Sequence, residues 1–465
     1  MRQGGRDESR QSSDFGESRA RADTSRRRLT IHWFRNDLRL HDNPALCRTV
    51  ELSRRDGEES TLLLIYVFDT SRIYGSEIKS AVSGEIKCGA CRAKFMLEAV
   101  DDLRLNLEER LGVRLLVATG RPEDALLELV KQNLQPGGDQ ADQDTSVDLN
   151  LVCQREICHE ELEVDKAVKT SLEGFIRDGG GGDGSRFNFE KIWGSLLYEP
   201  CDLPFEGGID GIPPTFNKFR REVETKCEVP RPLEAPSQER LGSLSTASVT
   251  RGYSYSATSV PTLSDLGYTD EQVECTRTVH PNSSLPKGYR GGESFALHRV
   301  KEWIWDRDML QTYFDTRNGL IGEDYSTKFS PWLACGCLSP RYVALECRRY
   351  EEARVANKST YCEFIRCAGL ISLSCARTVS NLQTESQVRD FVVAHSLFLM
   401  YQYMTFETQT WNEMLKTNRV RLRAASEGLF QVLCREARAT NLLSSWHSWQ
   451  SGRRRTQMEE NTRAY

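Results

Sequence analysis

The chain is predicted to be an α/β protein: an N-terminal doubly wound parallel sheet followed by an all-α part. Between residues 29 and 205, nearly continuous apolar segments alternate with amphipathic helical patterns. Continuous apolar segments are typical of strands that are buried on both faces of a parallel sheet. From residue 292 to about residue 356 the pattern is helical, and after residue 361 the periodicity is weak and mixed.

Four strands and four helices are expected to alternate in the first part. Strands are predicted over residues 29–34, 61–68, 113–118 and 147–152. Helices are predicted from the Asp42-Asn43-Pro44 start, over 92–111, from 120–124 onward, and over 156–175. Because strands joined by crossover helices run in parallel, this order predicts a doubly wound sheet.

The rest of the chain divides by composition. Residues 206–290, rich in Ser, Thr, Pro and Gly, are predicted to be an inter-domain linker with short helices. In the helical part, 291–361, one face carries Ala296, Val300, Trp303 and Ile304, and Ser339-Pro340 caps a helix that runs to about residue 356. A disordered arm over 1–28 and a basic tail over 362–465 complete the division, and the tail is interpreted as solvated rather than as a nucleic-acid contact.

Composition places the chain among ordinary globular proteins. Of its 465 residues 28% are charged, the net charge is −5, and the pI is about 6.0, so any surface for nucleic acid must be a local patch. Fifteen irregularly spaced cysteines favour reduced thiols in an intracellular, soluble protein. The most apolar segment, 391–406, is too short to cross a bilayer, so no membrane partner is expected. The Arg- and Ser-rich arm also contains acids, which leaves nucleus or cytoplasm and chloroplast or mitochondrion open.

Three features carry chemistry in other proteins but are interpreted as structural here. Cys88-Gly89-Ala90-Cys91 precedes a predicted helix, where a redox dithiol would lie, but no Trp and Pro accompany it. The seven histidines are not spaced as metal pairs, so no metal site is predicted. Arg35, Asn36, Asp37 and Arg39 follow the first strand, where ligands of such sheets bind, but a salt-bridged turn that locks the strand to the next helix is favoured.

A polar cluster near residue 328 is the strongest candidate for an anion site. Ser330 is predicted as an N-cap and Pro331 as the first helical residue. Ser326, Thr327 and Lys328 precede them and add hydroxyl donors and a positive charge, which suits a diphosphate at a helix start. The alternative is an ordinary capped helix after a polar turn.

Three segments together resemble the photolyase/cryptochrome family, and within it the cryptochrome-DASH branch. They are the motif over residues 31–46 (IHWFRNDLRLHDNPAL), Gly291-Gly292-Glu293-Ser294 with the 313–333 segment, and Cys337-Leu338-Ser339-Pro340-Arg341. The resemblance covers residues 29–361 with gaps.

The resemblance implies a blue-light flavoprotein, a deoxyribodipyrimidine photo-lyase or photoreceptor. Its DNA partner would be single-stranded and contain cyclobutane pyrimidine dimers, and the protein would be a monomer. Its N-terminal α/β domain would hold an antenna, 5,10-methenyltetrahydrofolate or a deazaflavin, with Glu156 as one contact. Its helical domain would hold FAD, and the positions that match the phosphate part of that site are Tyr313, Ser326, Thr327, Lys328, Phe329 and Ser330.

The resemblance stops abruptly after Tyr361, which implies a truncated flavin-binding domain. The family's later stretches, which contact the isoalloxazine ring and the adenine, do not occur, and its tryptophan relay cannot be assigned, so no catalytic residue is named. A truncated product or an error in the gene model would explain such a break. The light-driven activity is therefore expected to be impaired. The alternative is a catalytically inactive binding or interaction protein that retains the α/β domain without stable FAD.

Overall fold

The computed structural model describes rather more than half of the chain, in several stretches. They are residues 27–54, 60–80, 84–134, 146–206, 211–213, 216–238, 256, 259–277, 285–286, 288–316, 323–324 and 327–354. The predicted tail lies wholly outside these residues, as does the predicted arm apart from its last two residues. Among the residues described, no helix is long and apolar enough to cross a bilayer.

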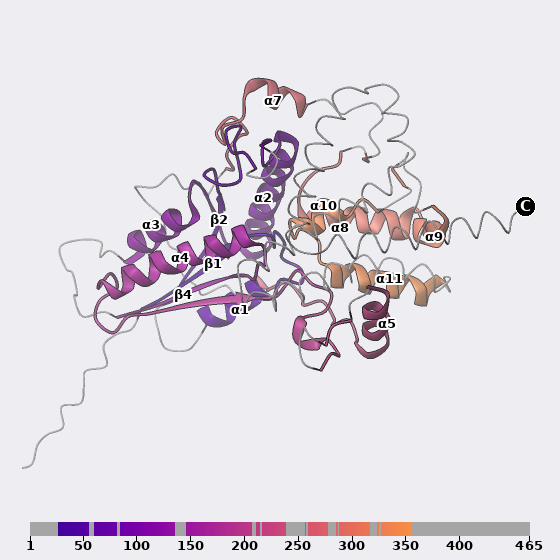
Figure 1. Cartoon of the computed structure of the whole chain (residues 1–465), viewed down its shortest axis with the longest axis horizontal. Helices are drawn as coiled ribbons and strands as arrows, with labels where there is room; N and C mark the ends of the chain where they lie inside the picture. The colour runs from indigo at the N-terminus through magenta and orange to yellow at the C-terminus, as the bar shows by residue number, and fades with distance from the viewer. Residues whose placement is uncertain are drawn as a thin grey trace, which may run out of the picture.

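A five-stranded parallel sheet forms the centre of the N-terminal part (Figure 1). Its strands are β1 (Arg27–Phe34), β2 (Ser60–Phe68), β3 (Leu115–Thr119), β4 (Val147–Gln154) and β5 (Arg186–Ile192). They lie in the order β3-β2-β1-β4-β5, and every pairing between them is parallel. The order reverses direction on either side of β1, which is the doubly wound arrangement predicted from the sequence.

Helices cover both faces of the sheet. They are α1 (Pro44–Ser53), α2 (Ala90–Leu111), α3 (Pro122–Leu134) and α4 (His159–Arg177). One apolar core lies between the sheet and the pair α3 and α4, which also pack on each other. The opposite face of the sheet packs on α2 and part of α1. The predicted helix start at residue 43 is confirmed, because the Asn43 side chain accepts a hydrogen bond from Leu46 N at 3.0 Å.

Two predictions about elements were wrong. The fifth strand, β5, was missed because its alternating sequence, RFNFEKI, follows a glycine-rich loop and forms the sheet edge, where one side stays partly exposed. The fourth helix begins at His159 rather than at residue 156. Cys158 is its N-cap, and the Cys158 backbone N–H donates to Glu161 Oε2 at 3.2 Å. Glu156 therefore lies in the loop between β4 and α4.

The second half of the described chain is helical. Its elements are η1 (Pro200–Asp202), α5 (Phe216–Lys226), α7 (Asp270–Cys275), α8 (Glu293–Lys301), the π-turn η2 (Glu302–Asp306), η3 (Met309–Thr312), α9 (Tyr313–Thr316), α10 (Ser330–Ala334) and α11 (Pro340–Arg354). The predicted apolar face of the 292–304 helix is confirmed, since Ala296, Val300, Trp303 and Ile304 are all 1% exposed or less.

Helix α2 joins the two halves into one core. Its residues Leu103 and Leu107 belong to the same apolar cluster as Trp303 and Trp332 from the helical half. Leu263, Leu266 and Tyr268, from the predicted linker, join this cluster, and the Tyr268 hydroxyl donates to the Cys88 carbonyl at 2.6 Å. Part of the linker is thus packed on α2, and at Ser256 it pairs with Val117 at the β3 edge of the sheet.

Candidate functional site

Glu156 lies beyond the carboxyl end of β4, in a cluster of polar side chains. Its Oε1 accepts hydrogen bonds from Gln154 Nε2 at 3.1 Å and from Asn36 N at 3.4 Å. Burial raises the pKa of Glu156 to about 8, and the nearby Glu161 carboxylate acts in the same direction. Gln154 Oε1, which is buried next to this carboxyl, has no hydrogen-bond partner within the described residues. The loop therefore offers a neutral carboxyl group and an unused acceptor at a place where doubly wound sheets bind ligands.

The turn after β1 is locked, but by other pairs than those predicted. Arg35 binds Asp165 on α4, with Nη1 2.5 Å from Oδ1, and does not pair with Asp37. Asp37 instead accepts from Arg35 N and from Asn43 Nδ2, which ties β1 to the start of α1. The predicted Arg–Asp pairing within the turn was wrong because α4, distant in sequence, presents a carboxylate to Arg35.

The predicted phosphate segment is only partly described. Ser326 lies outside the described residues, while Thr327, Lys328, Phe329 and Ser330 lie within them. Ser330 is the first residue of α10 and Phe329 is the N-cap, so the predicted cap position was wrong by one residue. The Thr327 Oγ1 accepts from Phe329 N at 3.4 Å, a local bond in the turn before the helix that leaves α10 without a side-chain cap. With five residues, α10 has little dipole, so an anion here would depend on side chains.

Two cationic side chains lie together at this segment. Arg299 from α8 is 3% exposed, and its Nε donates to Thr327 O at 3.4 Å. Burial lowers the pKa of Lys328, and the adjacent Arg299 guanidinium lowers it further. The Lys328 backbone has a φ of 60°, which is uncommon for a residue with a side chain, and its carbonyl accepts from the Tyr289 hydroxyl at 2.6 Å. Arg299 is itself ion-paired, since its Nη1 lies 2.9 Å from Glu302 Oε2 and its Nη2 lies 3.7 Å from Asp324 Oδ1, so an anion here would compete with these carboxylates for Arg299.

The Trp303 ring contacts two more of the residues that were predicted to bind the cofactor. Its ring meets Tyr313 edge-on, with ring centroids 5.4 Å apart, and Phe329 edge-on at 6.2 Å. Phe329 is 2% exposed and is a core residue. The structure thus groups Tyr313, Thr327, Lys328, Phe329 and Ser330 in the helical half, whereas Glu156 lies at the sheet.

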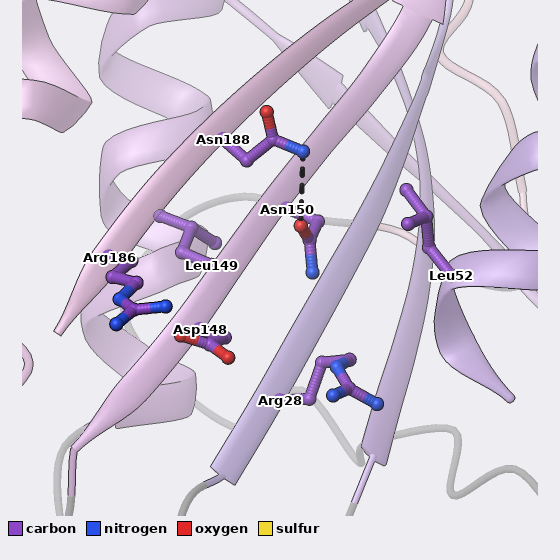
Figure 2. A pocket seen from close by; sticks show the side chains of 7 residues that line it. All are labelled: Arg28, Leu52, Asp148, Leu149, Asn150, Arg186 and Asn188. Carbon is purple, nitrogen blue, oxygen red and sulfur yellow. Dashed lines mark hydrogen bonds between the residues drawn. The ribbon is translucent and has the colours of Figure 1, made fainter. Parts of the chain in front are cut away.

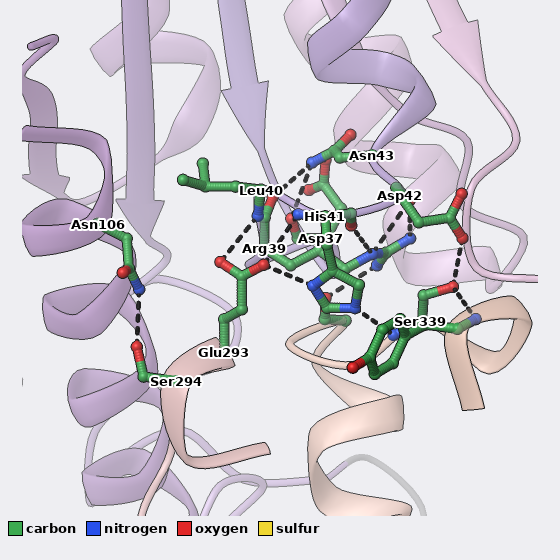
Figure 3. A network of polar contacts seen from close by, with 12 residues as sticks. Asp37, Arg39, Leu40, His41, Asp42, Asn43, Asn106, Glu293, Ser294 and Ser339 are labelled. Atoms are coloured by element: carbon green, nitrogen blue, oxygen red, sulfur yellow. Dashed lines mark hydrogen bonds and ion pairs between the residues drawn. The ribbon is translucent and has the colours of Figure 1, made fainter. Parts of the chain in front are cut away.

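A buried polar network joins the two halves of the molecule (Figure 3). His41 Nδ1 lies 2.5 Å from Glu293 Oε1, and both Glu293 oxygens also accept backbone N–H groups, from Leu40 and His41. Burial opposes ionisation of Glu293, but the hydrogen bonds from His41 and Leu40 outweigh it and hold the pKa of this carboxyl below its ordinary value. His41 Nε2 accepts from Ser339 N at 3.2 Å, so the ring bridges α8 and the start of α11.

The second part of this network is a buried ion pair. Arg341 donates to Asp42 through two nitrogens, Nε at 2.9 Å and Nη2 at 2.7 Å, and both residues are largely buried. The Ser339 hydroxyl also donates to Asp42, and it accepts from Arg341 N at 3.1 Å, which confirms Ser339 as a helix cap. Arg39 adds a bond from Nη1 to Gly336 O at 2.8 Å. The motif around residues 39–42 therefore binds the two later motifs directly.

Sequence reasoning missed this network, although it had singled out each of its three segments. Asp42 had been interpreted as part of a helix start, and no periodicity signal pairs it with Arg341, 299 positions later. Arg299 was also missed, because a charged residue on an amphipathic helix is normally solvated. The sequence did contain one indication of buried charges. Several charged residues lie in segments that are otherwise apolar or glycine-rich.

A pocket of about 150 Å³ lies elsewhere, near the amino ends of β1, β4 and β5 (Figure 2). It is lined by Arg28, Leu52, Asp148, Leu149, Asn150, Arg186 and Asn188. Asn188 Nδ2 donates to Asn150 Oδ1 at 3.4 Å across its floor. Asp148 and Glu156 lie at opposite ends of β4, so this pocket does not belong to either group of predicted site residues.

Comparisons with known proteins agree with the family resemblance of the sequence motifs. The family model for DNA photolyase matches residues 30–137. Cryptochrome DASH, chloroplastic/mitochondrial, of Ostreococcus tauri is 38% identical over 341 residues, which are 72% of this chain and 57% of that protein. The protein of the same name from Arabidopsis thaliana is 37% identical over 333 residues, 72% of this chain and 49% of its own length.

A solved structure extends the agreement to three dimensions. The cryptochrome of Synechocystis sp. PCC6803 matches with a TM-score of 0.59 and 29% identity, covering 78% of this chain and 64% of that one. A class III photolyase from Agrobacterium tumefaciens, 22% identical with a TM-score of 0.50, shares the fold. The chain spans about half the length of the curated relatives that it matches. Sequence similarity over both halves, the shared fold and the three motifs that meet at one network place the chain in the photolyase/cryptochrome family.

Proposed function

We propose that the chain is a blue-light flavoprotein of the cryptochrome-DASH type whose light-driven DNA repair is impaired. The observation that carries the proposal is the pair of cations, Lys328 and Arg299, in the segment that matches the family's flavin phosphate site. FAD bound there would supply the photochemistry, absorbing blue light and passing an electron to a pyrimidine dimer. The partner would be single-stranded DNA that contains such dimers, bound by a monomer.

The described residues have a defined share in such a site. Lys328 and Arg299 would neutralise a diphosphate, and the Thr327 and Ser330 hydroxyls would add donors. Tyr313 and Phe329, held against Trp303, would fix the walls beside it. The segments that would hold the ring and the adenine belong to the part of the family pattern that this sequence lacks after Tyr361. The remaining contacts must also offset the entropy lost when the cofactor is ordered, so weak binding is expected.

Flavin content of the purified full chain tests this proposal. A blue absorption band that stays with the protein through gel filtration would support it, and Lys328→Ala should lower flavin affinity by roughly one to two decades. Lys301→Ala removes an exposed lysine of α8 and should leave the affinity unchanged. Equal affinity in all three proteins would show that the phosphate site lies elsewhere.

Repair is tested separately, with single-stranded DNA that contains cyclobutane dimers. We expect no light-dependent loss of dimers above a flavin-free control, because a photolyase must hold the flavin ring near a flipped-out dimer and exclude water. Efficient repair by this chain would contradict the impairment. A colourless protein would instead favour the second candidate, an interaction protein without stable FAD. The observation in favour of that candidate is the loss of the family pattern after Tyr361.

Glu156 is proposed as a contact for an antenna folate, 5,10-methenyltetrahydrofolate. The neutral carboxyl group and the unpaired Gln154 Oε1 fit a ligand that both donates and accepts hydrogen bonds. Titration with the folate, followed by its near-ultraviolet absorption after gel filtration, should show binding to the wild type that Glu156→Ala weakens. Exposed Glu163→Ala, on α4, is the matched control. Unchanged retention in Glu156→Ala would remove this residue from the antenna site.

A further inference from the structure

Two cysteine sulfurs meet in the turn between α10 and α11. Cys335 Sγ and Cys337 Sγ are 3.4 Å apart, and neither belongs to a disulfide. The sequence pattern had drawn attention to Cys88 and Cys91 instead. Those two differ in environment, since Cys88 is buried and Cys91 is exposed.

The turn holds the two sulfurs in place from both sides. Gly336, between them, has a φ of 73°, a conformation that glycine adopts readily. Its carbonyl accepts from Arg39 Nη1, and the Cys335 carbonyl accepts from Leu38 N at 3.4 Å. Because these bonds lead to the segment that follows β1, the dithiol lies beside the network that joins the two halves of the molecule.

We propose that Cys335 and Cys337 are a reversible redox dithiol that hydrogen peroxide oxidises to an intrachain disulfide. The sulfurs need to approach by roughly 1.4 Å, from 3.4 Å to a bonded distance of about 2.05 Å. Side-chain rotation within the turn can supply most of this movement. The bond would close the turn whose Gly336 carbonyl accepts from Arg39. This inference is independent of flavin binding.

The chemistry proceeds in two balanced steps. The Cys335 thiolate attacks a peroxide oxygen, an S–O bond forms, the O–O bond breaks, and the leaving hydroxide takes the released proton as water. The Cys337 sulfur then attacks the Cys335 sulfenic sulfur, an S–S bond forms, the S–O bond breaks, and a second water leaves with the Cys337 proton. Two electrons and two protons pass from the thiols to the peroxide, which yields two waters.

The surroundings of the two sulfurs indicate that Cys335 reacts with the peroxide first. Its side chain is 5% exposed and that of Cys337 is fully buried, so a small oxidant meets Cys335 first. A hydrogen bond from the Cys337 thiol lowers the pKa of Cys335, whereas burial raises the pKa of Cys337. The Pro331 carbonyl, 3.1 Å from Cys335 Sγ, opposes ionisation. The reaction is therefore expected to be slower than that of an exposed, strongly acidic thiol.

Peptide mass after peroxide treatment tests the proposal directly. Trypsin cleaves after Lys328 and Arg341, so residues 329–341 form a peptide whose cysteines are Cys335 and Cys337. The reduced, native full chain is treated with hydrogen peroxide, quenched, alkylated and digested. We expect this peptide to become lighter by two hydrogens and to resist alkylation, and dithiothreitol should restore two alkylatable thiols.

Variants and an internal reference make the outcome decisive. The two-hydrogen loss should disappear in Cys335→Ser and in Cys337→Ser, and it should persist in Cys91→Ser. Cys91, in the tryptic peptide 88–92, reports the peroxide dose in the wild type. If a variant fails to fold, the wild-type peptide masses still test the proposal. Recovery of peptide 329–341 with two alkylated cysteines at a dose that oxidises Cys91 would overturn the proposal. So would sulfinic acid without the lighter peptide, or a cross-link to another cysteine.

Discussion

At the scale of single residues, the molecule buries ionisable groups in two different ways, one without and one with a charged partner. Glu156 is the clearest case, because a raised pKa means that folding favours its protonated form. Asp42 and Arg341 are the contrasting case, because each charge is buried but has a partner. The two kinds of residue lead to different expectations for stability.

Glu156→Gln should flatten the dependence of stability on pH. The folded state keeps the Glu156 proton up to about pH 8, and the unfolded state releases it near the ordinary value of 4.5. The contribution of this group is therefore fully present below pH 4.5 and is lost as pH rises to about 8, by at most about 5 kcal/mol. Urea unfolding at several pH values measures the slope. Glu163→Gln, an exposed control, should keep the wild-type slope, and an equally steep slope in Glu156→Gln would contradict the assignment.

Arg341→Gln should destabilise the protein by about 3–5 kcal/mol, because it leaves the buried Asp42 carboxylate without its charged partner. Arg349→Gln is the matched control on the same helix. Its side chain is 57% exposed, and its partner Glu346, which is buried, keeps a hydrogen bond from Trp305 Nε1 at 2.8 Å, so the loss should stay under about 1 kcal/mol. Denaturant unfolding gives both values. A similar small loss for the two variants would mean that Asp42 finds other donors.

At the scale of elements, a close backbone contact fixes how the α10–α11 turn sits on the segment after β1. A Cβ atom added to Gly336 would lie 1.9 Å from the Asn36 carbonyl oxygen, a contact that neither backbone can relieve locally. Gly291 has the same property against α2, where a Cβ would lie 1.9 Å from Phe95 O. Glycine at these positions lets elements approach more closely than any side chain allows.

Gly336→Ala should therefore destabilise the protein much more than Gly84→Ala does. The two glycines have nearly the same φ, 73° and 72°, but a Cβ at Gly84 meets nothing within 4 Å. Gly84→Ala should cost about 1–2 kcal/mol for the left-handed backbone alone, and Gly336→Ala should add the displacement of two packed segments. Thermal unfolding compares them, and equal shifts in Tm would show that the clash is relieved without cost.

At the scale of the whole molecule, the predicted domains share one apolar core. Leu107 of α2, Tyr268 of the predicted linker and Trp332 of the helical half belong to the same cluster. The network of His41, Asp42, Glu293 and Arg341 lies at the same junction. The division into domains at 205 and 290 stays a prediction, and the shared core favours unfolding of the described part as one unit.

Native-state hydrogen exchange should reveal this cooperativity. Buried amides of β2 and of α8 should exchange with similar free energies of opening, because exposing either one disrupts the common core. Arg341→Gln should lower both values by the same amount, since both sets of amides open with the common core. Exchange of α8 far ahead of β2 in the wild type would indicate two separate units.

Local sequence patterns suffice to predict four of the five strands, the four helices that cover them, and the family. Continuous apolar strands, the Asn43 and Ser339 caps and the 292–304 apolar face are local patterns, and each is confirmed because its physical cause acts within a few residues. The edge strand β5 was missed for the same reason, since its alternating pattern has no strong local signal.

The pairing of groups that are distant in sequence could not be predicted and follows from packing. Arg35 with Asp165, Asp42 with Arg341, and Arg299 beside Lys328 join residues that no periodicity relates, and Cys335 and Cys337 face each other only because Gly336 turns between them. The physical reason is that a charge or a thiol is compatible with many local conformations. Its partner is set by packing, which brings segments together across hundreds of positions in the chain.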